Sequence, residues 1–539
     1  MAGKETLREA VQSSPALATY LKAHPEFGEP ELVTLQLGFK LREDEIANHI
    51  YRTGPNLFVH VVSDDKGMRH YNSVGPTLPD DQKKLYVKIR DTLLQNAFYA
   101  KHNPINIAEF DKELDTLFDN QTKLSENPVV RLFEEKLLNK IAVKDPAARE
   151  NILHFIKRDL VRLGTLDPPF ADTFLEEISG NGTNNIWIYH KIFGPLESNV
   201  HFESEAELQK YMYHITELLD RPATDSHPII DVAFPDGSRA NILYGTDISK
   251  RGTSYTLRKF SSTPVSVTQL VNWNTMGADE AAYLWLGLEN NLSLFMCGET
   301  ASGKTTTLNA LTAFINPTAK VYTVEDTPEV NLPHKNWTRA ITLEGKLGMF
   351  HLLKLALECR PNFVIVGEFR DQEGAVAFQA MQAGYPVMAT FHAGHIGTLV
   401  QRLSGDPIFI PKDFLANLNL VVFQAPVTIN NKVVRRVINI NEIEGYSAYT
   451  NSVVTRNTFV WEATRDFHSF RGMYNSFAMD SIVARRMKAK SRDEVYKEIE
   501  KRGKVIAAMV ENKIFNYYDT FDIFQKYRTG GLEALPFSV

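Results

Sequence analysis

The chain has 539 residues, which is too many for one hydrophobic core and indicates two to four domains. Apolar residues make up 43% and charged residues 23% with both signs mixed, a composition that excludes a disordered polyelectrolyte. The net charge of −6 disfavours a nucleic-acid-coating protein, and two cysteines exclude a disulfide framework or a four-thiolate zinc site.

The first half of the chain predicts several small modules. Residues 1–30 are polar and interrupted by prolines, so we expect a mobile N-terminal arm. Residues 31–164 predict a small α/β piece, with a hairpin over 57–63 and 68–74, followed by helices. One of these helices would carry an apolar stripe at helical spacing. The stripe consists of Leu132, Phe133, Leu137, Leu138 and Ile141.

The second half predicts a different organisation. Residues 165–260 indicate a compact α+β domain with a helix over 204–219 and a hairpin turn at 235–238. Residues 261–278 are typical of a linker. Residues 279–539 alternate apolar strands with helices, which implies a parallel sheet, and they end in a helical region. The first 30 residues lack a signal peptide's apolar core, and no run reaches the roughly 18 apolar residues of a membrane span. We therefore expect a soluble chain.

A phosphate-binding loop is the clearest functional signal. A short apolar strand runs into G-x-x-x-x-G-K-T, and a helix follows. Glycines and a helix N-terminus let backbone N–H groups surround an anion, Lys304 reaches the β and γ phosphates of ATP, and the Thr305 hydroxyl ligates Mg²⁺. The expected nucleotide-binding residues are Gly298, Glu299, Thr300, Ala301, Ser302, Gly303, Lys304, Thr305 and Thr306. The pattern predicts a P-loop NTPase that hydrolyses ATP.

Carboxylates after two further strands are candidates to complete this site. Glu368 follows the buried run 363–366, where an acidic group beside the P-loop strand would hold Mg²⁺, directly or through water. Asp371 is the alternative to Glu368, or an ordinary helix cap. Glu325 and Glu329 follow a second strand, 321–324, where a carboxylate would position or deprotonate the attacking water. The sequence does not decide which glutamate is the base.

A histidine pair follows a third strand. His392 and His395 are three residues apart, but no third ligand is spaced to complete a zinc site. We interpret His392 as a γ-phosphate sensor.

Four segments in this order resemble one family, the secretion-superfamily ATPases of type II and type IV secretion, pili and the archaellum. The segments are the P-loop, the Asp box 324–329, the atypical Walker B motif 366–371 and the His box 390–395. The likeness is closest to the archaellum motor ATPase. It covers residues 160–425 well and is faint before residue 120.

The resemblance implies a fold and a set of partners. It implies an α/β protein with a C-terminal RecA-like P-loop NTPase domain and an N-terminal α+β region containing a PAS-like module. It further implies a homo-hexamer on the cytoplasmic face of the membrane, in peripheral contact with it. Expected partners are a polytopic membrane platform protein and, for an archaellum, a second RecA-like ATP-binding protein. By matching position, Arg239, Arg251 and Arg258 are the arginines that would complete the ATP site.

Two alternatives stay open beside the archaellum motor. An archaeal type II-like secretion or adhesive pilus ATPase belongs to the same class. A hexameric nucleic-acid motor belongs to another class, but the sequence lacks a basic, aromatic-interleaved groove, and no nucleic acid is expected.

Overall fold

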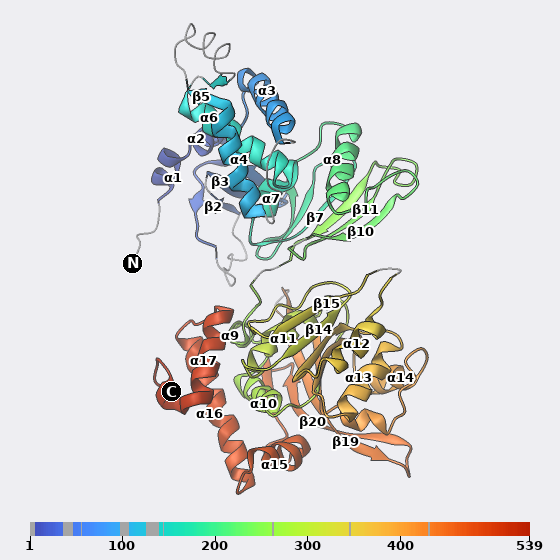
Figure 1. Cartoon of the computed structure of the whole chain (residues 1–539). Coiled ribbons are helices and arrows are strands. Elements are labelled where there is room, and N and C mark those ends of the chain that lie inside the picture. The colour runs from blue at the N-terminus through green and yellow to red at the C-terminus, as the bar shows by residue number, and fades with distance from the viewer. Residues whose placement is uncertain are drawn as a thin grey trace. The chain divides into compact units, whose positions relative to one another are not determined.

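A computed structural model of the chain describes residues 6–35, 47–54, 56–97, 107–124, 140–143, 145–234, 236–260, 263–343, 346–429 and 432–539. It divides into two compact units, residues 1–260 and 261–539 (Figure 1). No helix in the described part of the chain is both long and apolar enough to cross a bilayer.

One twisted sheet runs through the first unit. Its strand order is β1-β2-β3-β4-β9-β8-β7-β12-β11-β10, and most neighbours are antiparallel. The strands are β1 Glu31–Leu32, β2 Asn48–Gly54, β3 Leu57–Ser63, β4 Arg69–Val74, β7 Leu175–Asn181, β8 Trp187–His190, β9 Gly194–Ser198, β10 Ile229–Ala233, β11 Arg239–Leu243 and β12 Ser254–Arg258. The β3–β4 and β10–β11 pairs confirm the two predicted hairpins.

This sheet crosses the domain boundary that the sequence predicts at residue 165. Strands β4 and β9 pair in parallel, with His70 opposite Glu197 and Tyr71 opposite Ser198. Helix α8 Glu205–Leu218 is capped by Ser204 and buries Leu208 and Met212 in the core of this sheet. The expected domains 31–164 and 165–260 therefore share one sheet, a long-range pairing that local patterns do not reveal.

Two short helices replace the irregular arm expected at the N-terminus. Helices α1 Leu7–Ser13 and α2 Pro15–Ala23 begin at the side-chain caps Thr6 and Ser14. Their Ala10 and Leu17 side chains are buried in an apolar cluster with Phe58 of β3. The expectation of a mobile arm is therefore wrong for residues 6–23, because each cap satisfies N–H groups at its helix start and the apolar face finds a partner.

A helical cluster completes the first unit. It comprises α3 Asp80–Ala97, α4 Ile107–Gln121 and α6 Pro146–Leu160 around buried Ile89, Phe118 and Ile152. The short strands β5 Thr122–Leu124 and β6 Ile141–Val143 pair in parallel beside it, and α7 Asp167–Ala171 follows. The predicted apolar stripe lies outside the described residues except for Ile141, which is in a strand rather than a helix.

The second unit has a parallel sheet extended by antiparallel strands. Its order is β15-β14-β16-β17-β13-β18-β19-β20-β21, with parallel pairing from β15 through β18. The strands are β13 Leu294–Cys297, β14 Val321–Glu325, β15 Trp337–Ile341, β16 Phe363–Glu368, β17 Val387–Phe391, β18 Leu420–Ile429, β19 Lys432–Ser447, β20 Ser452–Glu462 and β21 Phe467–Phe470. The predicted parallel sheet is confirmed.

Helices cover both faces of this parallel sheet (Figure 1). They are α9 Val267–Asn272, α10 Ala278–Glu289, α11 Lys304–Leu311, α12 Met349–Glu358, α13 Glu373–Gln382, α14 Ile396–Ser404, α15 Ala484–Met487, α16 Arg492–Glu511 and α17 Tyr517–Gly530. Leu294 and Met296 of β13 join one core with α10, α16 and α17, whereas Phe295 and Cys297 join the other with α12 and α13. This alternation is that of a strand buried on both sides.

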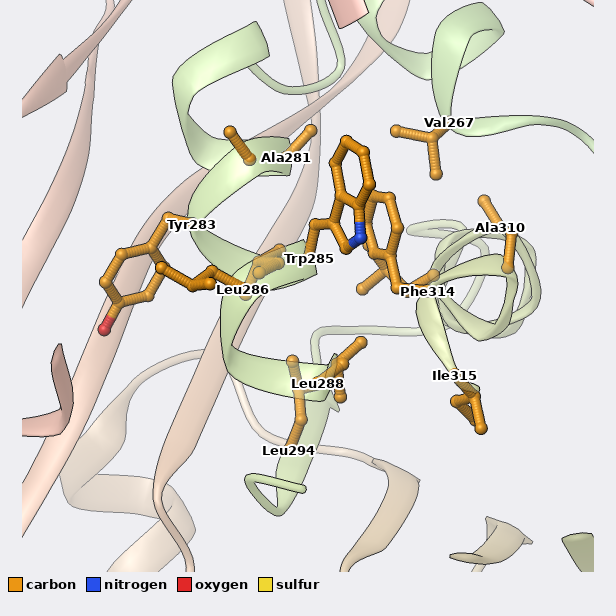
Figure 2. Close-up of a cluster of buried hydrophobic side chains, with 14 of the residues drawn as sticks. Val267, Ala281, Tyr283, Trp285, Leu286, Leu288, Leu294, Ala310, Phe314 and Ile315 are labelled. Atoms are coloured by element: carbon orange, nitrogen blue, oxygen red, sulfur yellow. The ribbon is translucent and has the colours of Figure 1, made fainter. Parts of the chain in front are cut away.

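Residues of the predicted linker 261–278 are buried in the larger hydrophobic core of the second unit. The ring of Trp285 on α10 stacks on Phe314 with 5.5 Å between centroids (Figure 2). Helix α9 begins with a capping box at Ser266, and its Val267 and Leu270 are buried in the same core. Residues 263–278 therefore form part of the second unit, and the expectation of a linker there is wrong, because these apolar side chains bury against α10 and α17.

Candidate functional site

The candidate site lies at one edge of the parallel sheet. Cys297 on β13 pairs with Phe391 on β17, Glu368 on β16 pairs with Thr390, and β14 ends at Glu325. Because parallel strands all end at the same edge, the segments that follow them converge there. The P-loop, the Walker B acid, the Asp box and the His box therefore leave the sheet side by side.

The strand order differs from the expected adjacency. The sequence predicts Glu368 on a strand beside the P-loop strand, and its spacing also allows the Asp-box strand to be adjacent to the P-loop strand. In the sheet, β17 lies between β16 and β13, and β14 lies beyond β16. The His-box strand is thus the direct neighbour of the P-loop strand, a crossover order that local sequence does not encode.

The P-loop has the backbone conformation of an anion-binding nest. Ala301 and Gly303 adopt left-handed conformations with φ of 61° and 90°. Gly303 precedes α11 without a side-chain cap on the helix, which leaves the first N–H groups for another partner. The Lys304 ammonium folds back on the loop and donates to the carbonyl oxygens of Gly298 at 3.0 Å and Glu299 at 2.9 Å.

The charge on Lys304 has carboxylate neighbours. Burial lowers the pKa of its ammonium, while the negative charges of Glu368 and Glu329 oppose that shift. Glu368 is half-buried and Glu329 is exposed. The structure therefore brings the predicted lysine together with two of the predicted carboxylates.

The buried side chain of Glu325 holds the Asp-box loop in place through hydrogen bonds to its backbone. It is fully buried, and its Oε1 accepts backbone N–H bonds from Glu329 at 2.8 Å and Val330 at 2.7 Å. Its Oε2 lies 3.4 Å from Nε of Arg339. Burial raises the pKa of Glu325 to about 7, against the lowering effect of these hydrogen bonds and of Arg339.

Asn309 joins the Asp box to the P-loop helix. Its Nδ2 donates to the Glu329 carbonyl oxygen at 2.8 Å, and its Oδ1 accepts from the Asn331 backbone N–H at 3.0 Å. Asn309 is not among the site residues predicted from the sequence. A polar side chain between the apolar residues Leu308 and Ala310 was the available signal.

The Walker B segment is held by short polar contacts. Glu368 accepts a hydrogen bond from the Arg370 guanidinium at 2.9 Å, and the Thr390 hydroxyl donates to the Gly367 carbonyl oxygen at 2.5 Å. Asp371 is exposed, and its backbone N–H bonds to Glu373 on α13. Of the two Walker B candidates, Glu368 and not Asp371 influences the pKa of Lys304.

The two histidines have different surroundings. His392 follows β17 with an exposed side chain, and Arg402 donates to its carbonyl oxygen. The His395 ring caps α14 by accepting from the Thr398 backbone N–H at 3.3 Å. The position of His392 at the site edge is compatible with a sensor, while His395 has a local structural role.

The arginines of the first unit do not lie together. In the β11–β12 hairpin, Arg239 pairs directly with Arg258, which also bonds to Glu177 at 3.1 Å. The buried Arg239 Nε has no hydrogen-bond partner among the described residues. Exposed Arg251 precedes β12 at the opposite end of the hairpin, roughly 13 Å of strand from the other two.

The side chains at the sheet edge fit a magnesium ion. Thr305 offers a hydroxyl oxygen and Glu368 a carboxylate, and Mg²⁺ prefers oxygen ligands and retains several waters. Thr305 is the second residue of α11, directly after Lys304.

Comparison with known proteins identifies the family. The model of the family described as "Type II/IV secretion system protein" matches residues 165–498, which is more than half of the chain. The chain belongs to this family. The match and the parallel sheet around the P-loop confirm the predicted α/β fold with a RecA-like domain and the predicted kinship to secretion-superfamily ATPases. They do not test the PAS-like module.

Three individual proteins illustrate what the chain is similar to. "Uncharacterized protein MJ0900" of Methanocaldococcus jannaschii is 42% identical over 99% of this chain and 98% of its own length. "Protein VirB11" of Agrobacterium fabrum is 28% identical over 31% of this chain and 58% of its own length. The "Crystal Structure of the Pilus Retraction Motor PilT and Bound ADP" is 17% identical, with a TM-score of 0.39, over 67% of this chain and 94% of that one.

Proposed function

We propose that this chain hydrolyses ATP with Mg²⁺ as the motor of a filament-assembly or secretion machine. The observation that supports the proposal is that four neighbouring parallel strands end at one edge of the sheet. The P-loop follows β13, His392 follows β17, Glu368 ends β16 and the Glu329 loop follows β14. Family membership supports the same class of protein.

Each element has a role in nucleotide binding. Backbone N–H groups of residues 299–304 surround the phosphates, and the Lys304 ammonium neutralises the β and γ charges after leaving the carbonyl oxygens it now contacts. Thr305 and Glu368 hold Mg²⁺, whose charge stabilises the transferring phosphoryl group. Glu368 is free for this role once the exposed Arg370 side chain swings away.

Glu329 is the better candidate for the general base. Glu325 uses one carboxylate oxygen for two backbone N–H groups and is fully buried, so it cannot easily reach a water on the substrate. Glu329 is exposed at the site edge, on a loop that Glu325 and Asn309 fix in place. We therefore assign Glu329 to the attacking water and Glu325 to positioning its loop.

Arg239 and Arg258 are our candidates for completing the site in an assembled ring. They are direct cross-strand neighbours, and a permanently charged guanidinium suits a transferring phosphoryl group. Arg251 lies at the other end of the hairpin and is the weaker candidate. A homo-hexamer in peripheral contact with the membrane, with a polytopic platform protein as partner, follows the family resemblance.

The archaellum is the specific machine we favour. The P-loop and the tail 513–518 carry that likeness, and the full-length relative in Methanocaldococcus jannaschii is an archaeal protein. In that machine a second RecA-like ATP-binding protein would be a further partner. A secretion or adhesive pilus system is the alternative within the class.

The ATPase rate of the purified chain tests the proposal. It is measured over a range of protein concentrations with Mg²⁺, with and without archaeal lipid and with and without DNA, and Lys304→Ala serves as the blank. Specific activity that rises steeply with protein concentration or lipid, and does not change when DNA is added, supports a ring whose ATP sites are completed between subunits. Flat activity stimulated by DNA would instead establish a nucleic-acid motor.

A further inference from the structure

The outer side of the P-loop is held by the β18–β19 hairpin. Nε2 of Gln424 on β18 donates to the Ser302 carbonyl oxygen at 2.9 Å. Nε of Arg435 on β19 donates to the adjacent Ala301 carbonyl oxygen at 3.2 Å. Two consecutive peptide carbonyls of the loop therefore bond outward to one hairpin.

Gln424 is built into this position rather than resting on the surface. It is 2% exposed and ends the buried part of β18, at a bulge where Phe423 pairs with Asn439 but Gln424 pairs with Val437. A bulge changes the direction of the next side chain. Here it accompanies a glutamine aimed at the loop.

The packing around Gln424 explains two glycines of the loop. A Cβ on Gly298 would lie 2.2 Å from the backbone carbonyl oxygen of Gln424, and one on Gly303 would lie 2.9 Å from the side-chain Nε2 of Gln424. Both contacts are closer than real Cβ atoms allow. The loop thus needs glycine at these positions partly because Gln424 approaches so closely.

The direction of these hydrogen bonds matters for anion binding. A peptide group that points its carbonyl oxygen outward points its N–H inward, and the reverse orientation would place a negative dipole against phosphate. Ala301 holds a left-handed conformation that a non-glycine residue adopts only at some cost, so the loop needs outside support to keep it. Gln424 and Arg435 supply that support at the two peptides concerned.

We propose that Gln424 is a positioning residue for nucleotide binding, assisted by Arg435. It keeps the P-loop carbonyls turned out and the N–H groups turned in, before the nucleotide arrives. This inference rests on the proposed ATP-binding function. It adds that the β18–β19 hairpin determines what fraction of the protein molecules has a P-loop in the conformation that binds nucleotide. Apparent affinity is the intrinsic affinity reduced by that fraction.

The decisive measurement is the ADP dissociation constant by calorimetry with Mg²⁺. Gln424→Met keeps the side-chain size and removes the donor, and we expect roughly tenfold weaker ADP binding. Arg435→Ala, at an exposed position, should weaken binding about threefold. Gln401→Met is the matched control, because Gln401 is an exposed glutamine on α14 of the same unit.

A carboxyl group at residue 424 should make ADP affinity depend on pH, whereas a mere loss of packing would not. In Gln424→Glu, a protonated carboxyl can donate to the Ser302 carbonyl oxygen, whereas the ionised form has only acceptors. Burial raises the pKa of such a carboxyl, so ADP affinity relative to the unchanged chain should fall as pH rises from 5 to 8. Thermal midpoints without nucleotide are recorded for every variant, and a Gln424→Met chain that does not fold leaves this pH profile and Arg435→Ala to decide.

The outcomes separate this inference from the proposed function. If the unchanged chain and Lys304→Ala bind ADP equally or not at all, the ATP-binding function itself fails. If the unchanged chain binds ADP in a Lys304-dependent way, but Gln424→Met matches Gln401→Met and Gln424→Glu has no pH profile, the positioning role is overturned.

Discussion

The two sheets of this protein deliver functional side chains in opposite ways. In the second unit, parallel strands β14, β16, β17 and β13 all end at one edge, so each motif after a strand arrives beside the others. In the first unit, the antiparallel β11–β12 hairpin sends Arg239 and Arg258 to one end and Arg251 to the other. Residues that follow parallel strands therefore gather at one end of the sheet whatever the strand order, whereas residues of an antiparallel hairpin are divided between its two ends.

Removing the lysine at the parallel edge should have the largest effect. Lys304→Ala deletes the positive charge at the centre of the converged site, so we expect at least about a thousandfold loss of ATP turnover. Turnover is measured by phosphate release, with Lys335→Ala as an exposed control in the same unit. Normal turnover in Lys304→Ala would show that the edge is not the active site.

Replacing the exposed acid should have the next largest effect. Glu329→Gln removes the proposed base while leaving the loop anchored by Glu325, so turnover should fall roughly a hundredfold with nucleotide binding retained. Exposed Glu358→Gln is the control. Loss of ADP binding together with turnover would point to a structural role for Glu329.

Substitutions of the three arginines in the β11–β12 hairpin test whether its two ends contribute differently to ATP turnover. Arg239→Ala and Arg258→Ala should each slow turnover about tenfold, because the pair lies together, while Arg251→Ala should have a smaller effect. Phosphate release at a protein concentration that saturates assembly is the measurement. Equal losses for all three variants would mean that the two ends of the hairpin serve the reaction alike.

Glu325 should affect stability more than turnover. Its pKa of about 7 lies above the ordinary 4.5, so between these values the folded chain keeps a proton that the unfolded chain releases. The free energy of unfolding should therefore fall by about 3 kcal/mol as pH rises through this window.

Glu325→Gln should flatten this dependence, because the amide does not titrate and its oxygen still accepts the Glu329 and Val330 N–H bonds. Denaturant unfolding of the second unit between pH 5 and 8 measures it. An unchanged slope would assign the pH dependence to other groups.

Local chemistry explains which features could be predicted. The hairpin at 57–74, the cap at Ser204 and the strand–loop–helix around Lys304 depend on neighbouring residues, and the sequence displays them directly. Thr6 and Ser14 are helix caps of the same kind, but the nearby prolines suggested an irregular arm. Pro15 instead occupies the first turn of α2, a position where proline favours a helix.

The sequence alone determined the P-loop, its lysine and the carboxylates after the strands, because strand, glycine and helix signals are local. Tertiary structure decided that β17 separates β16 from β13, that Glu325 lies buried beneath Glu329, and that Gln424 reaches the loop from 122 residues away. The physical reason is that strand order and buried hydrogen-bond partners depend on long-range packing, which no local pattern specifies.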